Sequence, residues 1–306
     1  MSAYRRSRVE FGSGGLTLRG TLRVPEGEGP FGAVVSTHGF AFVERTFALH
    51  DYPGAFADAG FVSLSYDHPC TGESDGLPRQ ELDPVAQQRG YSDAITYLLS
   101  LGVVDPSRIG IWGTSYSGGH VLAVAADDRR VSCVVSQAQT ISGRRNLTGR
   151  LAQDDLAAMR ARWAEDRDGR FAGGEAGYAR AGSTDTVAFR ARHDPEHFTG
   201  YRPEVTVRSY EWYFGYEPGW LVPRIAPTPL LMIVCDGDRT TPTADSLWAY
   251  GRAHEPKQLL LLTGGHYAVY ESGFAAARDA AVAWFGTHLD DTNAAARQHG
   301  HDQEES

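Results

Sequence analysis

The stretch RIGIWGTSYSGGH, from Arg108 to His120, decides the fold. An apolar run ends at Gly113, and a run of small residues that favours a helix begins after Ser115. This order predicts a strand, a sharp turn and a helix, with Ser115 lifted out of the chain at the end of a buried strand. The residues two before and two after such a serine must be small, so that the backbone can fold back without collision. Gly113 and Ser117 meet that demand, although Ser117 departs from the usual G-x-S-x-G pattern.

Taken alone, a pentapeptide of this kind is common by chance, and a Gly/Ser loop between two core elements is the alternative. The neighbouring sequence favours the turn, because short apolar strands alternate with helices. Strands are expected at 33–37, 61–67, 109–112, 131–136, 229–235 and 258–262, helices at 47–59, 83–101, 116–126, 244–254 and 274–289, a turn at 105–108, and an edge hairpin of 9–11 with 16–24. The pattern predicts an α/β fold with a doubly wound, mostly parallel sheet.

The alternation stops between residues 143 and 222, where charged helical pieces, Gly-rich loops and an aromatic run take over. We interpret this segment as an inserted, largely helical cap. Residues 1–142 and 223–289 would then form one catalytic core. The polar tail 290–306 is expected to fray.

The composition and charge of the chain argue against several kinds of partner and binding site. The chain has 306 residues, a net charge of −9 and no obvious cluster of Lys and Arg, which argues against a nucleic-acid or anionic-membrane partner. Three cysteines without paired spacing and the absence of an HExxH motif argue against disulfides, a metal site or a cofactor. No apolar leader follows the charged N-terminus, so a cytoplasmic protein is expected, and a homodimer is compatible with the sequence.

A serine hydroxyl becomes a strong nucleophile only when a histidine accepts its proton and a carboxylate orients that histidine. Later strand ends supply both groups in the order Ser, Asp, His. Asp236 and Asp238 follow the strand PLLMIV in CDGDRTTP, and His266 follows QLLLL in TGGHYAVY. Asp238 is preferred as the acid because Asp236 abuts the strand and is better placed to shape the turn, but the roles could be reversed.

The other histidines have simpler interpretations. His120 lies inside the helix after Ser115 and is expected in the core or behind the site. His38 is expected to shape the loop that follows its strand. The remaining histidines considered, His50, His193, His197, His254 and His288, are expected to be solvated.

The tetrahedral intermediate of acyl transfer needs two N–H donors for its oxyanion. The residue after the nucleophile, Tyr116, supplies the first, and Phe40 in the loop His38-Gly39-Phe40 is the candidate for the second.

Together these pieces resemble the α/β-hydrolase superfamily, in particular bacterial esterase-like members related to dienelactone hydrolases and X-prolyl peptidase catalytic domains. The matching motifs are STHGF, SYDHPCTGESDG, VDPSRIGIWGTSYSGGH, IVCDGDRTTP and TGGHYAVY, which cover nearly the whole core. The resemblance implies the α/β-hydrolase fold and places nucleophile, acid and base on Ser115, Asp238 and His266. Ser117 for glycine, and Pro69-Cys70 where Arg-Gly is frequent, are departures that remove no catalytic group.

The sequence therefore predicts a serine hydrolase that cleaves an ester, or a related acyl bond, of a small hydrophobic compound through an acyl-enzyme. Hydrolysis of a carbon-carbon or amide bond on the same triad is the enzymatic alternative, and a non-catalytic ligand-binding protein is the other. The aromatic run 210–220 precedes the strand that leads to Asp238. Most of these rings are expected to anchor the cap, with Trp212, Tyr213 and Tyr216 predicted to contact the substrate.

Overall fold

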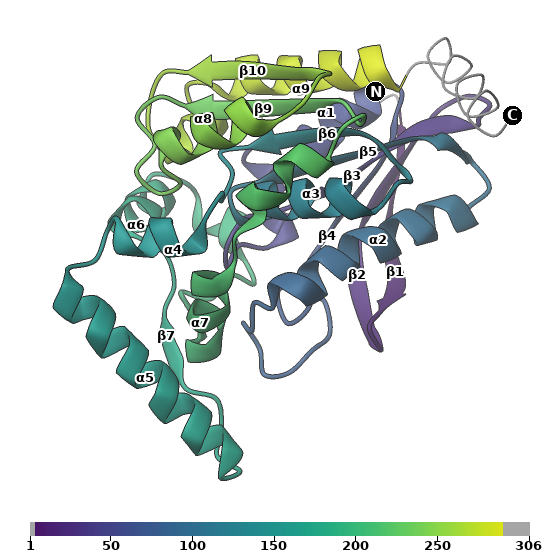
Figure 1. Ribbon diagram of the computed structural model, residues 1–306. Coiled ribbons are helices and arrows are strands. Elements are labelled where there is room, and N and C mark those ends of the chain that lie inside the picture. Colours follow the sequence, from purple (N-terminus) through teal and green to yellow (C-terminus); the bar gives the residue numbers. More distant parts are fainter. Residues whose placement is uncertain (1–3, 290–306) are drawn as a thin grey trace, which may run out of the picture.

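An eight-stranded sheet forms the centre of the computed structural model, which describes residues 4–289 (Figure 1). Its strand order is β1-β2-β4-β3-β5-β6-β9-β10. The strands are β1 (Tyr4–Ser13), β2 (Leu16–Pro25), β3 (Phe31–Thr37), β4 (Val62–Tyr66), β5 (Val104–Thr114), β6 (Val131–Gln137), β9 (Leu230–Cys235) and β10 (Lys257–Leu262). Within this sheet, β2 pairs antiparallel with β1 and with β4, and the other pairings are parallel.

Helices cover both faces of the sheet, as the doubly wound prediction requires (Figure 1). One face carries α2 (Pro84–Ser100), α3 (Tyr116–Asp127) and α8 (Thr243–Arg252), and the other carries α1 (Tyr52–Asp58) and α9 (Phe274–His288). β3 and β4 are buried along almost their whole length, because both of their faces are covered. Because most of the strands run parallel, their carboxyl ends meet at one edge of the sheet.

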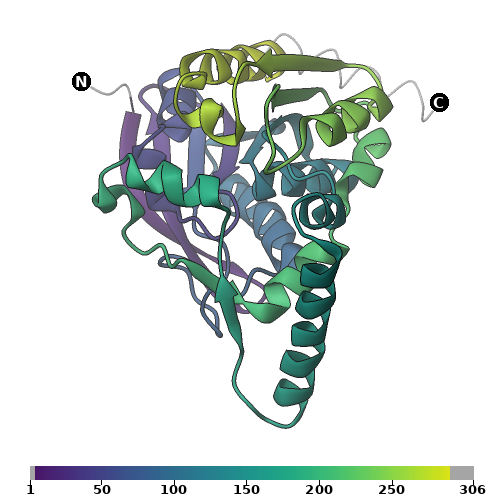
Figure 2. The same ribbon diagram turned by 90° about the vertical axis from the view of Figure 1, so that its left-hand side faces the viewer.

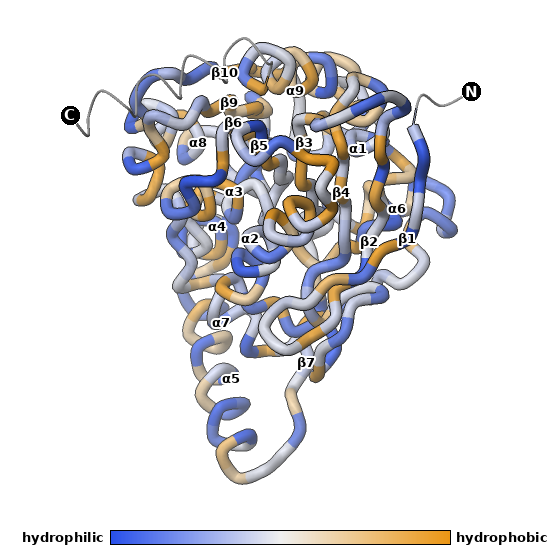
Figure 3. The backbone as a smooth tube through the Cα atoms, turned by 90° about the vertical axis from the view of Figure 1, so that its right-hand side faces the viewer, coloured by the Kyte–Doolittle hydropathy of each residue, from blue (hydrophilic) through white to orange (hydrophobic). Residues whose placement is uncertain are grey.

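The segment between β6 and β9 leaves the sheet (Figure 2). It contains α4 (Gly143–Thr148), α5 (Gln153–Phe171), β7 (Tyr178–Arg180), α6 (Thr184–Ala191), the 3-10 helix η2 (Pro195–Phe198), β8 (Glu204–Thr206), α7 (Val207–Gly215) and the 3-10 helix η3 (Pro218–Arg224). Figure 3 shows many hydrophilic residues along α5, and of its nineteen residues only Trp163 is buried. We refer to residues 143–222 as the inserted segment.

The structure differs locally from the sequence-based expectations. The helix expected over 47–59 is divided into a 3-10 helix, η1 (Glu44–Ala48), and α1, because the Asp51 carboxylate accepts a hydrogen bond from Gly54 N–H and starts a new helix. The turn expected at 105–108 is part of β5. The short antiparallel pair β7–β8 was not expected, since three residues per strand leave too weak a pattern. The expected fraying of the tail 290–306 lies outside the described residues.

Candidate active site

Ser115 occupies a strained turn between β5 and α3. Its φ of 57° and ψ of −113° place it in a backbone region that non-glycine residues rarely adopt. The turn is held from both sides, because Ser115 N–H donates to the Gln137 carbonyl over 2.8 Å and Ser115 O accepts from Thr140 N–H over 2.8 Å. A Cβ on Gly113 would come within 2.2 Å of the Ser117 carbonyl oxygen, so only glycine fits there. The turn thus presents the Ser115 hydroxyl at the edge where the parallel strands end.

A chain of hydrogen bonds joins Ser115 to a buried carboxylate. His266 Nε2 lies 3.0 Å from Ser115 Oγ, and His266 Nδ1 lies 2.7 Å from Asp238 Oδ2. A carboxylate only accepts, so Nδ1 donates to Asp238, and in the neutral ring Nε2 is left to accept the serine proton. His266 begins the 3-10 helix η4 (His266–Tyr270) after β10, and Asp238 follows β9. Residues far apart in the sequence therefore meet at one strand edge.

The structure places Asp238, and not Asp236, against the histidine. Asp238 Oδ1 accepts hydrogen bonds from the backbone N–H groups of Thr240 and Thr241 at 2.7 and 2.8 Å. Burial alone would raise the pKa of Asp238, but the nearby His266 and the hydrogen bonds from His266 and Thr241 outweigh it and hold that pKa below its ordinary value. Asp236 is exposed and accepts from Gly264 N–H over 2.9 Å, so it shapes the turn.

The loop after β3 passes directly over the serine. A Cβ on Gly39 would lie 2.9 Å from Ser115 Cβ, which shows how closely the backbone of this loop approaches. The ring of the next residue, Phe40, packs edge-on against Tyr116 with 5.4 Å between centroids. Tyr116 is the first residue of α3, and the first N–H groups of a helix have no partner within it. Phe40 and Tyr116 thus flank Ser115 from two different elements.

Ser117, the departure from the usual motif, is the centre of a buried polar network. Its hydroxyl donates to the His38 carbonyl over 2.5 Å and accepts from Thr37 Oγ1 over 2.8 Å. His68 Nε2 lies 2.8 Å from the same oxygen. His68 was not predicted from the sequence, although it follows β4 at the strand edge that carries the other polar groups. The network ties α3 to the loop of Phe40.

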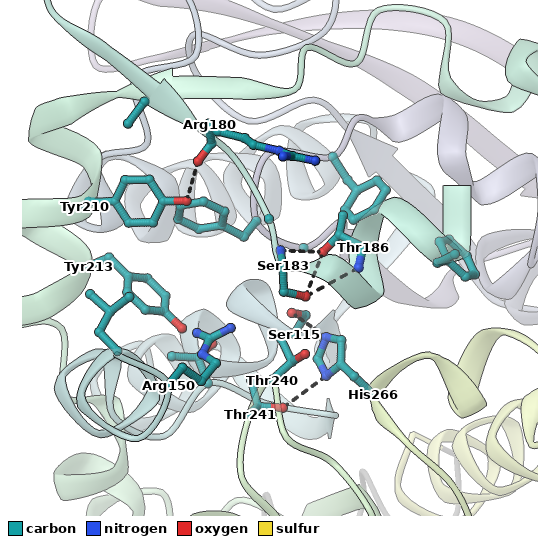
Figure 4. A pocket seen from close by; sticks show the side chains of 18 of the residues that line it. Ser115, Arg150, Arg180, Ser183, Thr186, Tyr210, Tyr213, Thr240, Thr241 and His266 are labelled. Atoms are coloured by element: carbon teal, nitrogen blue, oxygen red, sulfur yellow. Dashed lines mark hydrogen bonds between the residues drawn. The ribbon is translucent and has the colours of Figure 1, made fainter. Parts of the chain in front are cut away.

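A cavity of about 580 Å³ opens on Ser115 and His266 (Figure 4). Its walls come from the loop after β3, from η4 and from the inserted segment, and they are mainly apolar. Tyr213 lines it, together with Tyr210 from the preceding turn of α7.

Two of the three predicted substrate contacts do not line the cavity. Trp212 does not line the cavity, since its ring packs under the Arg208 guanidinium with 4.6 Å to the centroid. Tyr216 does not line it either, because its hydroxyl is bound to His120 Nδ1 at 2.9 Å. Among the expected contacts the cavity therefore retains Tyr213 alone.

The positions of the histidines agree with the expectation for His120 and His38 but not for His50. His120 is fully buried, and its Nε2 lies 2.8 Å from Gln87 Oε1. His38 Nδ1 lies 3.1 Å from the Gly39 carbonyl, within the loop it was expected to shape. The expectation that His50 is solvated is wrong, because its ring is 6% exposed and lies 4.6 Å from that of Tyr270.

Burial sets the charge state of these rings. It lowers the pKa of His38 to about 4 and that of His50 and His120 to about 3, and burial with the neighbouring His38 and His120 lowers that of His68 well below its usual value. All four are therefore neutral in the folded protein at pH 7.

We expect the Tm to fall by roughly 5 °C or more between pH 6.5 and pH 5. In the unfolded chain a histidine takes up its proton near pH 6.5, whereas these folded rings stay neutral to about pH 4 or below, so the stability present above pH 6.5 is lost as the pH falls. Each ring contributes a slope of about 1.4 kcal/mol per pH unit. Burial raises the pKa of Asp67 to about 6. Asp67 therefore takes up a proton more readily in the folded protein, which offsets the contribution of about one of the four histidines.

Thermal melts of the wild type and of His120→Gln across this range test the expectation. The variant lacks one titrating ring and should show a shallower dependence of Tm on pH, whatever its stability at pH 7. Equal slopes, or a wild-type Tm that does not change, would contradict it.

Within residues 4–289, no group of three or more His, Cys, Asp or Glu side chains is arranged to hold a metal ion. In the same residues no helix combines the length and apolar character needed to cross a membrane.

Comparison with known proteins identifies the family of this chain. The model of the X-Pro dipeptidyl-peptidase (S15) family matches residues 14–194, which is more than half of the chain. The chain belongs to this family. The S15 chain is 32% identical over 282 residues to a thiohydrolase of Eupenicillium brefeldianum, covering 86% of this chain and 88% of that protein. It is also 30% identical over 277 residues to the quorum-quenching protein AidA of Acinetobacter baumannii, with the same coverage.

Among solved structures, the S15 chain is similar to the α/β hydrolase GrgF of Penicillium sp. sh18. The TM-score is 0.80 at 27% identity, over 93% of this chain and 99% of that one. The chain is thus an enzyme with the α/β-hydrolase fold, as the sequence motifs implied.

Proposed function

We propose that this enzyme is a serine hydrolase that cleaves an ester or thioester of a small hydrophobic acyl compound. The observation that carries the proposal is the unbroken hydrogen-bonded chain from Ser115 through His266 to Asp238, opening on a mainly apolar cavity. The similarity of this chain to a thiohydrolase also supports hydrolysis of an acyl bond. The inserted segment would serve as the cap that closes over the acyl group.

In the proposed reaction, Ser115 Oγ attacks the carbonyl carbon while its proton passes to His266 Nε2. Asp238 stabilises the imidazolium that forms. The backbone N–H groups of Phe40 and Tyr116 would bind the oxyanion. The carbon–oxygen or carbon–sulfur bond then breaks, and His266 returns the proton to the leaving group. Water repeats the sequence on the acyl-enzyme and releases the acid and free Ser115.

Peptide hydrolysis is the competing reaction, because the family description names a dipeptidyl-peptidase. Such an enzyme must bind the substrate's N-terminal ammonium, and carboxylates are the groups that do this best. No Asp or Glu of the described residues lines the cavity. The lining thus favours an acyl compound without a free ammonium group.

Labelling with a fluorophosphonate, followed by a panel of oxoesters and thioesters of graded acyl length and one dipeptide anilide, tests the proposal. We expect a single adduct on the peptide that contains Ser115, and turnover of medium-length or aromatic acyl substrates. A label on another residue would disprove the assignment of the nucleophile. Turnover of the anilide alone would replace the ester or thioester with a peptide as substrate.

A further inference from the structure

The cavity carries an unusual charge for this protein. The chain has 38 acidic residues and a net charge of −9. Among the described residues, however, the cavity is lined by three arginines, Arg150, Arg162 and Arg180, and by no carboxylate. All three belong to the inserted segment, and Figure 4 shows Arg150 and Arg180 among the side chains around Ser115. Among the described residues, this acidic protein thus lines the cavity at its candidate nucleophile with arginines and with no carboxylate.

The arginines of the inserted segment differ in whether they form ion pairs. Five of them form ion pairs with carboxylates, and none of the five lines the cavity: Arg145, Arg167, Arg170, Arg192 and Arg208. The three that line the cavity form no ion pair with any described residue. Four more outside the cavity also lack an ion pair with any described residue: Arg144, Arg160, Arg190 and Arg202, of which the first three lie over aromatic rings. Every ion-paired arginine of the segment thus lies outside the cavity, and the arginines at the cavity have no carboxylate as counter-ion.

The guanidinium groups at the cavity are held mainly by the backbone. Arg150 Nε donates to the Asn146 carbonyl over 2.7 Å, which orients the group and leaves both Nη atoms without an acceptor among the described residues. Arg162 donates to the Tyr178 carbonyl. A planar guanidinium with free N–H groups matches a carboxylate or a phosphate, which it binds through two parallel hydrogen bonds.

We propose that the substrate carries an anionic group, a carboxylate or a phosphate, which Arg150, Arg162 and Arg180 bind while the acyl chain occupies the apolar wall. This rests on the proposed function. When a substrate expels water from the cavity, guanidinium groups without a counter-ion lose hydration, and an anion on the substrate replaces it. A local positive field also draws anions to a protein whose net charge repels them. The expectation of a purely apolar substrate is thereby revised.

Three thioesters distinguish where the anion lies. Hexanoyl-N-acetylcysteamine is neutral, its adipoyl monothioester analogue has a carboxylate on the acyl chain, and hexanoyl-CoA has phosphates on the leaving group. We expect kcat/KM for at least one anionic substrate to exceed that for the neutral one by about 10-fold or more, which is the size of one charge-assisted hydrogen bond. The preference should appear as a lower KM for the anionic substrate, and it should become smaller as the salt concentration is raised.

The double variant Arg150→Gln/Arg180→Gln should lose this preference, because its kcat/KM should fall by about 10-fold more on the preferred anionic thioester than on the neutral one. Arg202→Gln, which removes one exposed arginine of the inserted segment outside the cavity, is the matched control and should retain the preference. Equal turnover of all three thioesters by the wild type would overturn the proposal. So would an equal loss on neutral and anionic substrates in the double variant.

A binding measurement distinguishes a failure of this proposal from a failure of the proposed function. The Kd of the adipoyl and hexanoyl thioesters, measured on Ser115→Ala, needs no turnover, so a preference for the anion is detectable even if the reaction is not thioester hydrolysis. Conversely, turnover of the neutral thioester with labelling of Ser115 supports the proposed function even where no charge preference appears.

Discussion

Replacing Ser115 with alanine is expected to lower kcat by about 10⁴- to 10⁶-fold on any ester or thioester that the wild type cleaves. The Ser115 hydroxyl lies 3.0 Å from His266 Nε2, and among the described residues no other serine hydroxyl bonds to that atom. Without Oγ there is no acyl-enzyme, and only binding and the oxyanion donors contribute to the rate. The measurement is kcat under saturating substrate, with circular dichroism to show that the variant is folded.

Ser100→Ala is the matched control, since Ser100 is an exposed serine at the end of α2 whose hydroxyl caps the Tyr97 carbonyl. It should retain wild-type kcat and the fluorophosphonate adduct, whereas Ser115→Ala should lose both. A Ser115→Ala enzyme with more than a few per cent of wild-type activity would rule out Ser115 as the nucleophile.

Asp238→Asn is expected to lower kcat by about 10⁴-fold. The carboxylate accepts the proton of His266 Nδ1 over 2.7 Å, whereas an amide nitrogen in its place would donate and favour the tautomer that cannot accept the serine proton. Asp236→Asn is the control in the same turn. Its side chain accepts only from Gly264 N–H among the described contacts, and an amide oxygen can replace that bond.

The pair is measured by kcat at neutral pH, and Asp236→Asn should stay within about 3-fold of the wild type, because its turn can keep its hydrogen bond. If Asp236→Asn were the damaging change and Asp238→Asn nearly silent, the acid would have to be reassigned. Two strongly impaired variants would instead indicate that the turn itself positions His266.

The residues of the candidate site could be proposed from the sequence because each of them follows a recognisable strand. Parallel strands end at one edge, so Ser115, Asp238 and His266 could be expected to converge although they are spread over more than 150 residues. The choice between Asp236 and Asp238 could not be settled, because both lie in the same short turn. It depends on which carboxylate points toward His266, and that is a matter of side-chain direction.

The lining of the cavity was predicted less well. The aromatic run was treated as one segment, but residues 207–215 form a helix, α7, which sends its side chains in different directions. Tyr210 and Tyr213 are three residues apart, lie on one face and line the cavity, while Trp212 points elsewhere. The arginines at the cavity could not be identified in the sequence, because an arginine in a highly charged segment is usually solvated. Only the folded chain shows which of them lack a carboxylate.

β6 pairs directly with β9, Val134 opposite Leu230, although the whole inserted segment separates them in the chain. The sheet is therefore continuous across the point of insertion, and its hydrogen bonds there do not depend on what the insertion contains. Mutations that lengthen, shorten or recharge residues 143–222 can change which compounds enter while leaving Ser115 and His266 in register. Such a division allows the cavity lining to change without disturbing the candidate active site, and it marks the segment as the natural unit for grafting between related enzymes.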